Sequence, residues 1–147
     1  MSGKVTLILL NGQDVSEFLL DAYTSAYVGV PLIFLSGDKG ICEEAEKFTP
    51  HIFTVAVKQG VGNSTVNIHP DLAVAQINAG MAQAVRGIPE QRPLSLPAHF
   101  SLDVHYRAAH DAYHYSFFPG AQLAGPTTVR VETNDYFDVL RFILFAV

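Results

Sequence analysis

The sequence predicts an α/β fold of alternating strands and helices, with a parallel core in its first half and further strands and helices, some of which could be antiparallel, in its second half. Strand-like and helix-like segments alternate along the 147 residues, as in α/β proteins. The apolar run VPLIFL at residues 30–35 is typical of a strand covered on both faces. The run TTVRVET at 127–133 alternates polar and apolar residues, as a half-exposed strand does. We expect one domain over residues 1–147, with 87–97 as the place where it could divide into two lobes.

A tight turn is expected directly after the first strand, which the apolar run VTLILL places at residues 5–10. Asn11 and Gly12 form this turn, because both central residues of a type I′ turn need a positive φ angle and this dipeptide is a common solution. The turn leads into the first helix.

That helix is expected at residues 16–28, because its apolar residues recur with a spacing that places them on one helical face. The Ser16 side chain can cap it by accepting a hydrogen bond from a free N–H of the first turn, and Asp14 is the alternative cap. Gly29 ends the helix.

The remaining elements follow from the same signals. Pro70 suits the first position of a helix, where its missing N–H costs nothing. Three prolines make residues 87–97 an extended connector. In chain order we expect a loop at 36–40, a helix at 41–48, a strand at 51–57, a polar glycine-containing loop at 58–68, a helix at 70–85, the connector, a strand at 100–106, a helix at 107–117, the strand at 127–133, and a last helix at 136–147 capped by Asn134 or Asp135.

Composition limits the compartment and the partners. The chain is 49% hydrophobic and 16% charged, as expected of a folded globular protein. A net charge of −5 with nine Lys and Arg argues against nucleic acid or an anionic membrane surface as a partner. No apolar run reaches the roughly 18 residues of a membrane span, and the N-terminus lacks a small-residue cleavage site. The single cysteine, Cys42, fits a reducing compartment and is expected to be a packed helix residue rather than a nucleophile. We therefore expect a cytoplasmic protein.

Three motifs resemble the second half of the zinc D-aminopeptidase family. They are VSEFLLDAYTSAYVGVPLIFLSGDKG at 15–40, TVAVKQGVGNSTVNIHP at 54–70, and FFPG…GPTTVRV within 117–131. They occur in the family's order and at similar spacing, and they extend over essentially the whole chain. The family begins with an Asp-Met-Glu-Gly-type segment and two separated histidines that bind zinc, and nothing in this sequence corresponds to them. The resemblance is therefore to the C-terminal half only.

The resemblance implies a zinc-dependent peptidase that removes N-terminal D-amino acids from short peptides. It also implies a homo-oligomer, ring-shaped in the complete enzyme, that encloses the active sites. The alternative is a non-catalytic structural or oligomerisation module that has kept the second half of the fold and lost the metal. The 147-residue chain alone is expected to hold little zinc and to be inactive, because a zinc site needs three or more protein ligands.

Glu17 is the candidate metal ligand. It lies in the opening turn of the first helix, where the positive end of the helix dipole favours an ionised carboxylate, and a carboxylate oxygen is an accepted zinc ligand. Taken by themselves, the residues favour a glutamate that only stabilises the helix start. The resemblance places Glu17 at the family's glutamate ligand, through the matching segments VSEF and DAYTSAYVGVP.

The loop predicted at 58–65 is the candidate substrate-binding segment, with Lys58, Asn63 and Ser64 as its binding residues. It follows a strand and precedes a helix, where α/β sheets place ligand-binding loops. Lys58 is a cation suited to a peptide carboxylate or carbonyl oxygen. An ordinary exposed loop is the alternative.

The histidines are a weaker signal for a metal site. His110 and His114 are four residues apart on a predicted helix and so share a face, with His105 before them. This spacing resembles zinc motifs, but the HExxH context is missing because Asp111 follows the first histidine. We expect an exposed or interfacial pair. Three further histidines are expected at element boundaries: His51, His69 and His99.

Overall fold

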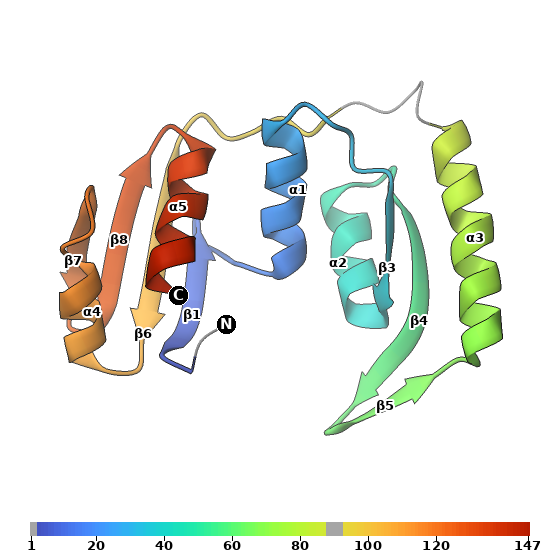
Figure 1. Ribbon diagram of the computed structural model, residues 1–147, viewed down its shortest axis with the longest axis horizontal. Coiled ribbons are helices and arrows are strands. Elements are labelled where there is room, and N and C mark those ends of the chain that lie inside the picture. Colours follow the sequence, from blue (N-terminus) through green and yellow to red (C-terminus); the bar gives the residue numbers. More distant parts are fainter. Residues whose placement is uncertain (1–2, 88–92) are drawn as a thin grey trace. The chain divides into compact units, whose positions relative to one another are not determined.

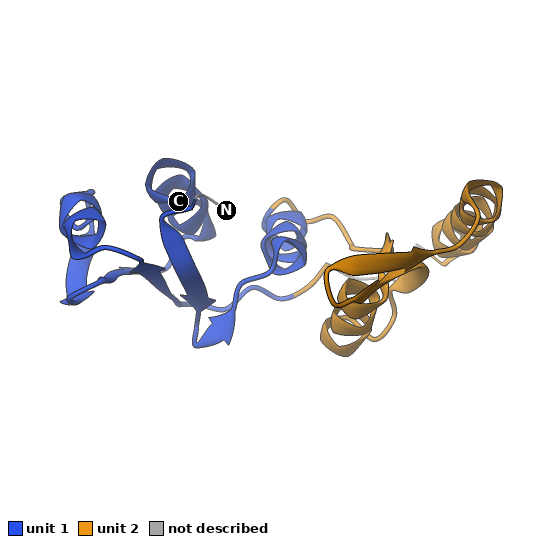
Figure 2. Ribbon diagram, turned by 90° about the horizontal axis from the view of Figure 1, so that it is seen from below, with its two compact units in different colours: residues 1–27, 95–147 blue, residues 28–94 orange. Residues whose placement is uncertain are grey.

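The chain forms two compact units. A computed structural model describes residues 3–87 and 93–147. Unit 1 combines Met1–Tyr27 with Ser95–Val147, and unit 2 consists of Val28–Leu94 (Figure 2). Residues 88–92 of the expected connector lie outside the described residues. The single domain expected over 1–147 stays a prediction, because two compact units can belong to one domain.

Unit 1 is built on a five-stranded sheet in which every neighbouring pair of strands is antiparallel. Two neighbouring strands of this sheet come from distant parts of the chain, with Val5 opposite Tyr106 and Leu10 opposite Leu102. In spatial order the strands are β2 (Gln13–Asp14), β1 (Val5–Leu10), β6 (Phe100–Tyr106), β8 (Thr128–Thr133) and β7 (Ala121–Gly125) (Figure 1).

Three helices complete unit 1: α1 (Glu17–Tyr27), α4 (Ala109–Tyr115) and α5 (Tyr136–Ala146). The helices α4 and α5 lie on the same face of the sheet (Figures 1 and 2). The Asp135 carboxylate caps α5 by accepting a hydrogen bond from the Phe137 N–H at 2.9 Å. This confirms one of the two caps expected for the last helix. Within the described residues, no helix combines the length and the apolar character needed to cross a membrane.

Unit 2 holds a three-stranded sheet between two helices. Its elements are β3 (Phe34–Asp38), α2 (Lys39–Phe48), β4 (Phe53–Val61), β5 (Ser64–Asn67) and α3 (Pro70–Arg86). The Thr54 hydroxyl of β4 donates to the Glu46 carboxylate on α2, whereas a Cβ built on Gly80 of α3 would lie 3.0 Å from Val55. Because successive strand residues point to opposite faces, the two helices cover opposite faces of this sheet.

The parallel core predicted for the first half of the chain is smaller than expected. The only parallel pair among the described strands is β3 with β4, while β1 pairs with β2 and β6 instead. The strand expected at 30–35 also begins later, at Phe34. Pro31 has no N–H to give to a neighbouring strand, and Val30 is 53% exposed. An apolar run was therefore not enough to predict a strand buried on both faces.

The loop predicted at 58–68 is also wrong, because this segment forms a two-stranded ribbon. The end of β4 pairs with β5, with Lys58 opposite Asn67 and Val61 opposite Ser64. Gly62 has φ +58° at the turn, a conformation that glycine adopts without steric cost. The ribbon residues are exposed, so the polar composition that suggested a loop reflects exposure to solvent.

Most of the other expected elements are confirmed within a few residues, including β1, β6, α3 and α5. Asn11 and Gly12 have φ values of 51° and 79°, as the predicted type I′ turn requires. The strand β7 was not anticipated, since its sequence AQLAG lacks the alternation that marks β8. The helix expected at 107–117 is limited to α4.

Tyr136 occupies the centre of the core of unit 1 and is only 1% exposed. Its ring lies 5.4 Å from that of Phe100 on β6 and 5.8 Å from that of Tyr23 on α1, measured between centroids. Its hydroxyl donates to the Leu20 carbonyl oxygen at 2.7 Å. Burial raises the pKa of this hydroxyl to about 12, so it remains a donor at neutral pH. Tyr136 thus joins α5, β6 and α1 through one side chain.

We expect Tyr136→Phe to lower the free energy of unfolding by about 0.5–1.5 kcal/mol, because it removes one buried hydrogen bond while keeping the ring. Tyr113→Phe is the matched control, since Tyr113 is 61% exposed. Urea unfolding followed by circular dichroism measures both. Equal unfolding free energies for the two variants would contradict the role given to Tyr136.

Candidate functional site

Glu17 is the first residue of α1 and is exposed. The residue before it caps the helix, because the Ser16 hydroxyl oxygen accepts a hydrogen bond from the Leu19 N–H at 3.1 Å. The Ser16 carbonyl oxygen also accepts the first helical hydrogen bond, from the Leu20 N–H at 3.3 Å. The expected serine cap is confirmed, and it fixes the position of the Glu17 backbone at the positive end of the helix.

A cavity of about 340 Å³ adjoins Glu17. Glu17 and Ser16 are the polar residues of its lining, and the other lining residues are hydrophobic. The Val15 N–H donates to the Ile8 carbonyl oxygen at 3.0 Å, which ties the residues before α1 to β1. The side chains lining the cavity come from β1, from α1 and the residues before it, and from the C-terminal end of the chain: Ile8, Val15, Ser16, Glu17, Leu20, Ile143 and Val147. The Glu17 side chain therefore lies beside a cavity lined mostly by hydrophobic residues.

The described residues contain no group of three or more His, Cys, Asp or Glu side chains that could hold a metal ion. Glu17 brings one carboxylate, whereas a zinc site needs three or four protein ligands. The residues that the structure describes therefore do not fit zinc by themselves, and Glu17 could act as a ligand only together with ligands from outside this described part.

The three predicted substrate-binding residues all lie on the β4–β5 ribbon of unit 2. Asn63 is at the turn, and Ser64 begins β5 opposite Val61. Lys58 lies further along β4, opposite Asn67. Because strand residues alternate between faces, Lys58 and Ser64 point to opposite faces of the ribbon. The structure therefore brings Asn63 and Ser64 together at the tip and places Lys58 apart from them.

The histidine pair on α4 is exposed. His110 Nε2 lies 3.7 Å from the Asp111 carboxylate, and the His114 ring packs edge-on against Tyr115, with centroids 4.9 Å apart. Neither joins a group of metal-binding side chains among the residues that the structure describes.

Cys42 is buried in α2 and only 3% exposed. Burial raises the pKa of its thiol, which disfavours the reactive thiolate. Cys42 is therefore part of the packing of unit 2, as the sequence predicted.

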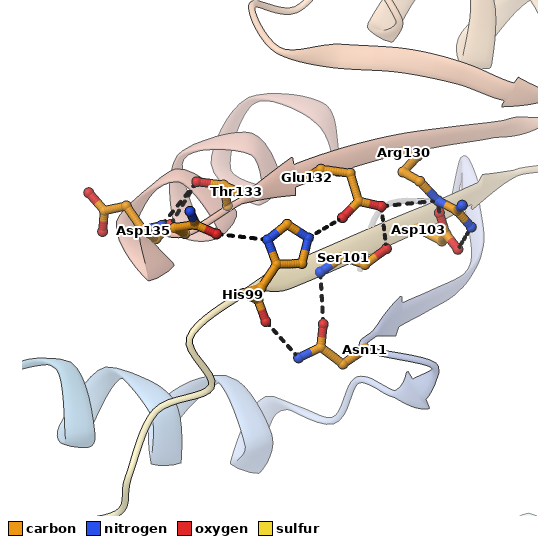
Figure 3. Close-up of polar contacts among 9 residues, drawn as sticks. Asn11, His99, Ser101, Asp103, Arg130, Glu132, Thr133 and Asp135 are labelled. Atoms are coloured by element: carbon orange, nitrogen blue, oxygen red, sulfur yellow. Dashed lines mark hydrogen bonds and ion pairs between the residues drawn. The ribbon is translucent and has the colours of Figure 1, made fainter.

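Sequence reasoning missed a polar network on the face of the unit 1 sheet opposite α4 and α5 (Figure 3). Three cross-strand pairs of β6 and β8 are hydrogen-bonded through their side chains. They are Ser101 with Glu132 at 2.8 Å, Asp103 with Arg130 through two bonds of 2.6 Å, and His105 with Thr128 at 3.0 Å. Polar and apolar residues alternate in the sequences of both strands, but the sequence does not show which residues of β6 and β8 lie opposite each other.

His99, the residue directly before β6, extends this network. Its ring nitrogens lie 2.8 Å from Asn134 Oδ1 and 2.6 Å from Glu132 Oε2. The sequence had suggested only a boundary residue at this position.

The fold and much of the sequence are similar to known D-aminopeptidases. Residues 1–145 match the family model described as Peptidase_M55: D-aminopeptidase. The D-aminopeptidase of Bacillus subtilis (strain 168) is 28% identical over 137 residues, which are 92% of this chain and 50% of that protein.

Among solved structures, the chain is similar to the Zn-dependent D-aminopeptidase DppA from Bacillus subtilis, described as a self-compartmentalizing protease. The TM-score is 0.88 at 25% sequence identity, and the similarity covers 99% of this chain and 54% of that one. The chain thus spans about half the length of the relatives that it matches.

Proposed function

Because the chain belongs to the peptidase M55 (D-aminopeptidase) family, we propose that it forms the C-terminal part of a zinc-dependent peptidase that removes N-terminal D-amino acids from short peptides. The observation that carries this proposal is the placement of Glu17, exposed at the capped start of α1 and at the edge of a cavity. The similarity to half of a Zn-dependent relative supports it. The remaining ligands would come from the part of the family fold that this chain does not span.

Within this proposal, the residues around Glu17 have two tasks. The Ser16 cap and the bond from Tyr136 to the Leu20 carbonyl hold the start of α1 in place. The apolar wall beside it limits the access of water and offers contacts to an aliphatic side chain.

The test is Glu17→Gln in the assembled enzyme, in which this sequence acts together with the rest of the family fold. A neutral amide is a much poorer zinc ligand than a carboxylate. We expect zinc content to fall and turnover of a D-Ala-D-Ala-type peptide to drop more than about 100-fold, beyond the 10–100-fold typical of residues that only orient ligands. Elemental analysis and steady-state kinetics measure these changes.

Glu43→Gln is the matched control, because Glu43 is a half-exposed surface carboxylate that lies 3.8 Å from the Lys39 ammonium. It should keep full zinc and full turnover. If Glu17→Gln behaves the same way and loses only about 0.3–1 kcal/mol of stability, Glu17 is merely a partner of the helix dipole. That result would favour the non-catalytic structural module.

We further propose that Lys58, Asn63 and Ser64 bind the peptide substrate. Lys58 would meet a carboxylate or carbonyl oxygen, and the tip residues would supply hydrogen bonds. In the assembled enzyme, Lys58→Met should raise KM about tenfold with a smaller change in kcat, as expected when binding common to ground state and transition state is lost. Lys47→Met, on α2, is the control and should leave KM unchanged. An unchanged KM for Lys58→Met would show that Lys58 does not bind the substrate.

We also propose that the protein is a homo-oligomer, with a ring-shaped assembly in the complete enzyme. The support is a relative described as self-compartmentalizing, together with large apolar side chains that are exposed in this chain. On α5, Leu144 and Phe145 are 75% and 64% exposed, and on α3, Val74 is 58% exposed. Contiguous exposed apolar residues commonly mark protein interfaces.

Light scattering at tens of micromolar tests this assembly. We expect a mass above the 16.0 kDa of one chain, because association would cover the exposed residues of α3 and α5. A mass that stays equal to that of a single chain over this concentration range would contradict the proposal.

A further inference from the structure

His99 lies where the chain returns to unit 1 and begins β6. Its imidazole is held between two oxygens, with Nδ1 2.8 Å from Asn134 Oδ1 and Nε2 2.6 Å from Glu132 Oε2 (Figure 3). Both oxygens belong to the segment in which β8 ends and α5 is about to start. One side chain therefore connects the entry to β6 with the junction of β8 and α5.

Both partner atoms are acceptors, so each ring nitrogen must donate a hydrogen atom to make both bonds. Only the imidazolium carries a hydrogen on each nitrogen, whereas a neutral imidazole has one donor and one acceptor. In the neutral ring, one nitrogen lone pair would face an oxygen lone pair. The observed arrangement is therefore complete only when His99 is protonated.

The surrounding charges favour that state. Glu132 is the carboxylate that faces His99, and its other oxygen accepts from the Ser101 hydroxyl at 2.8 Å. Arg130 lies 3.8 Å from Glu132, but it is bound to Asp103 through two bonds of 2.6 Å. The hydrogen bonds to Asn134 and Glu132 raise the pKa of His99. Those from Ser101 and His99 lower the pKa of Glu132.

The backbone of the same residue is tied to a third segment. The Asn11 side-chain amide donates to the His99 carbonyl oxygen at 3.1 Å, and its oxygen accepts from the Ser101 N–H at 2.8 Å. Asn11 belongs to the turn between β1 and β2, shortly before α1. His99 thus lies at the meeting point of three segments of unit 1.

We propose that His99 is a pH-operated latch. As an imidazolium it connects the start of β6 to the junction of β8 and α5 through two hydrogen bonds, and loss of its proton breaks one of them. The released state leaves the residues that lead into β6 held by the Asn11 contacts and by one remaining bond of the imidazole.

The direction of the pH effect follows from the raised pKa of His99 in the folded protein. An unfolded chain has a histidine pKa of about 6.5. The stabilisation is therefore fully present below about pH 6.5 and is lost as the pH rises through the higher pKa of the folded state. Because the groups are partly exposed, with side-chain exposures of 57% for His99 and 42% for Glu132, salt should weaken the effect.

The direct test is a titration of the histidine side chains by ¹⁵N-detected long-range NMR, with the His99 signal assigned by its loss in His99→Gln. We expect both His99 nitrogens to be protonated at pH 6 and the midpoint of the His99 titration to lie above about 6.5. Glu132→Gln and Asn134→Ala should each lower that midpoint, because the first removes the negative charge beside the imidazole and the second removes one acceptor. A midpoint at or below about 6.5 in the wild-type protein, or one that neither variant moves, would overturn the proposal.

A second measurement reports on the latch rather than on the proton alone. The urea midpoint of unfolding should fall between pH 6 and pH 8 by a larger amount in the wild-type protein than in His99→Gln. His110→Gln, which removes a histidine with an 84% exposed side chain, should retain the wild-type pH dependence. Identical pH dependence of the urea midpoint in the wild type and His99→Gln would show that protonated His99 does not stabilise the fold, and would overturn the proposal.

Discussion

The arrangement of unit 1 depends on the contact between Tyr136 and α1. The sheet itself is held by its hydrogen bonds, but α1 reaches the core through Tyr23, which packs on Tyr136 and Phe100. The Tyr136 hydroxyl adds a bond to the Leu20 carbonyl, a group that also accepts from the Thr24 hydroxyl at 2.7 Å. This contact connects the helix that begins with Glu17 to the aromatic core of unit 1. The position of the candidate ligand therefore depends in part on aromatic packing at Tyr23, which lies further along the same helix.

In the part of the chain that the structure describes, Glu17 is a carboxylate without the partners that a zinc site requires. Glu17 is capped, exposed and placed beside an apolar hollow, yet no group of metal-binding side chains occurs among the described residues. Both facts agree with a chain that spans about half of its relatives. If Glu17 binds zinc as proposed, the part of the family fold that this chain does not span would have to supply the remaining ligands.

Local signals predicted much of the fold, and non-local pairing explains most of the errors. The dipeptide Asn11-Gly12 specified its turn because the required φ angles suit few other residues, and alternation located β6 at Phe100–Tyr106 without error. The pairing of β1 with β6 could not be predicted, because about 90 residues separate them and no local pattern encodes register. The same limit hid the bond between His99 and Glu132. Glu17 stays a predicted ligand that rests on the family resemblance, because a glutamate at a helix start can equally be a partner of the helix dipole.

The central claim is that Glu17 is a ligand in a zinc site completed by residues outside this chain. Anomalous X-ray diffraction at the zinc edge, on crystals of the assembled enzyme, tests it most directly. The account predicts a zinc peak about 2.0–2.2 Å from a Glu17 carboxylate oxygen, with the other ligands contributed by the rest of the family fold. A fully occupied zinc site in which Glu17 takes no part would contradict it.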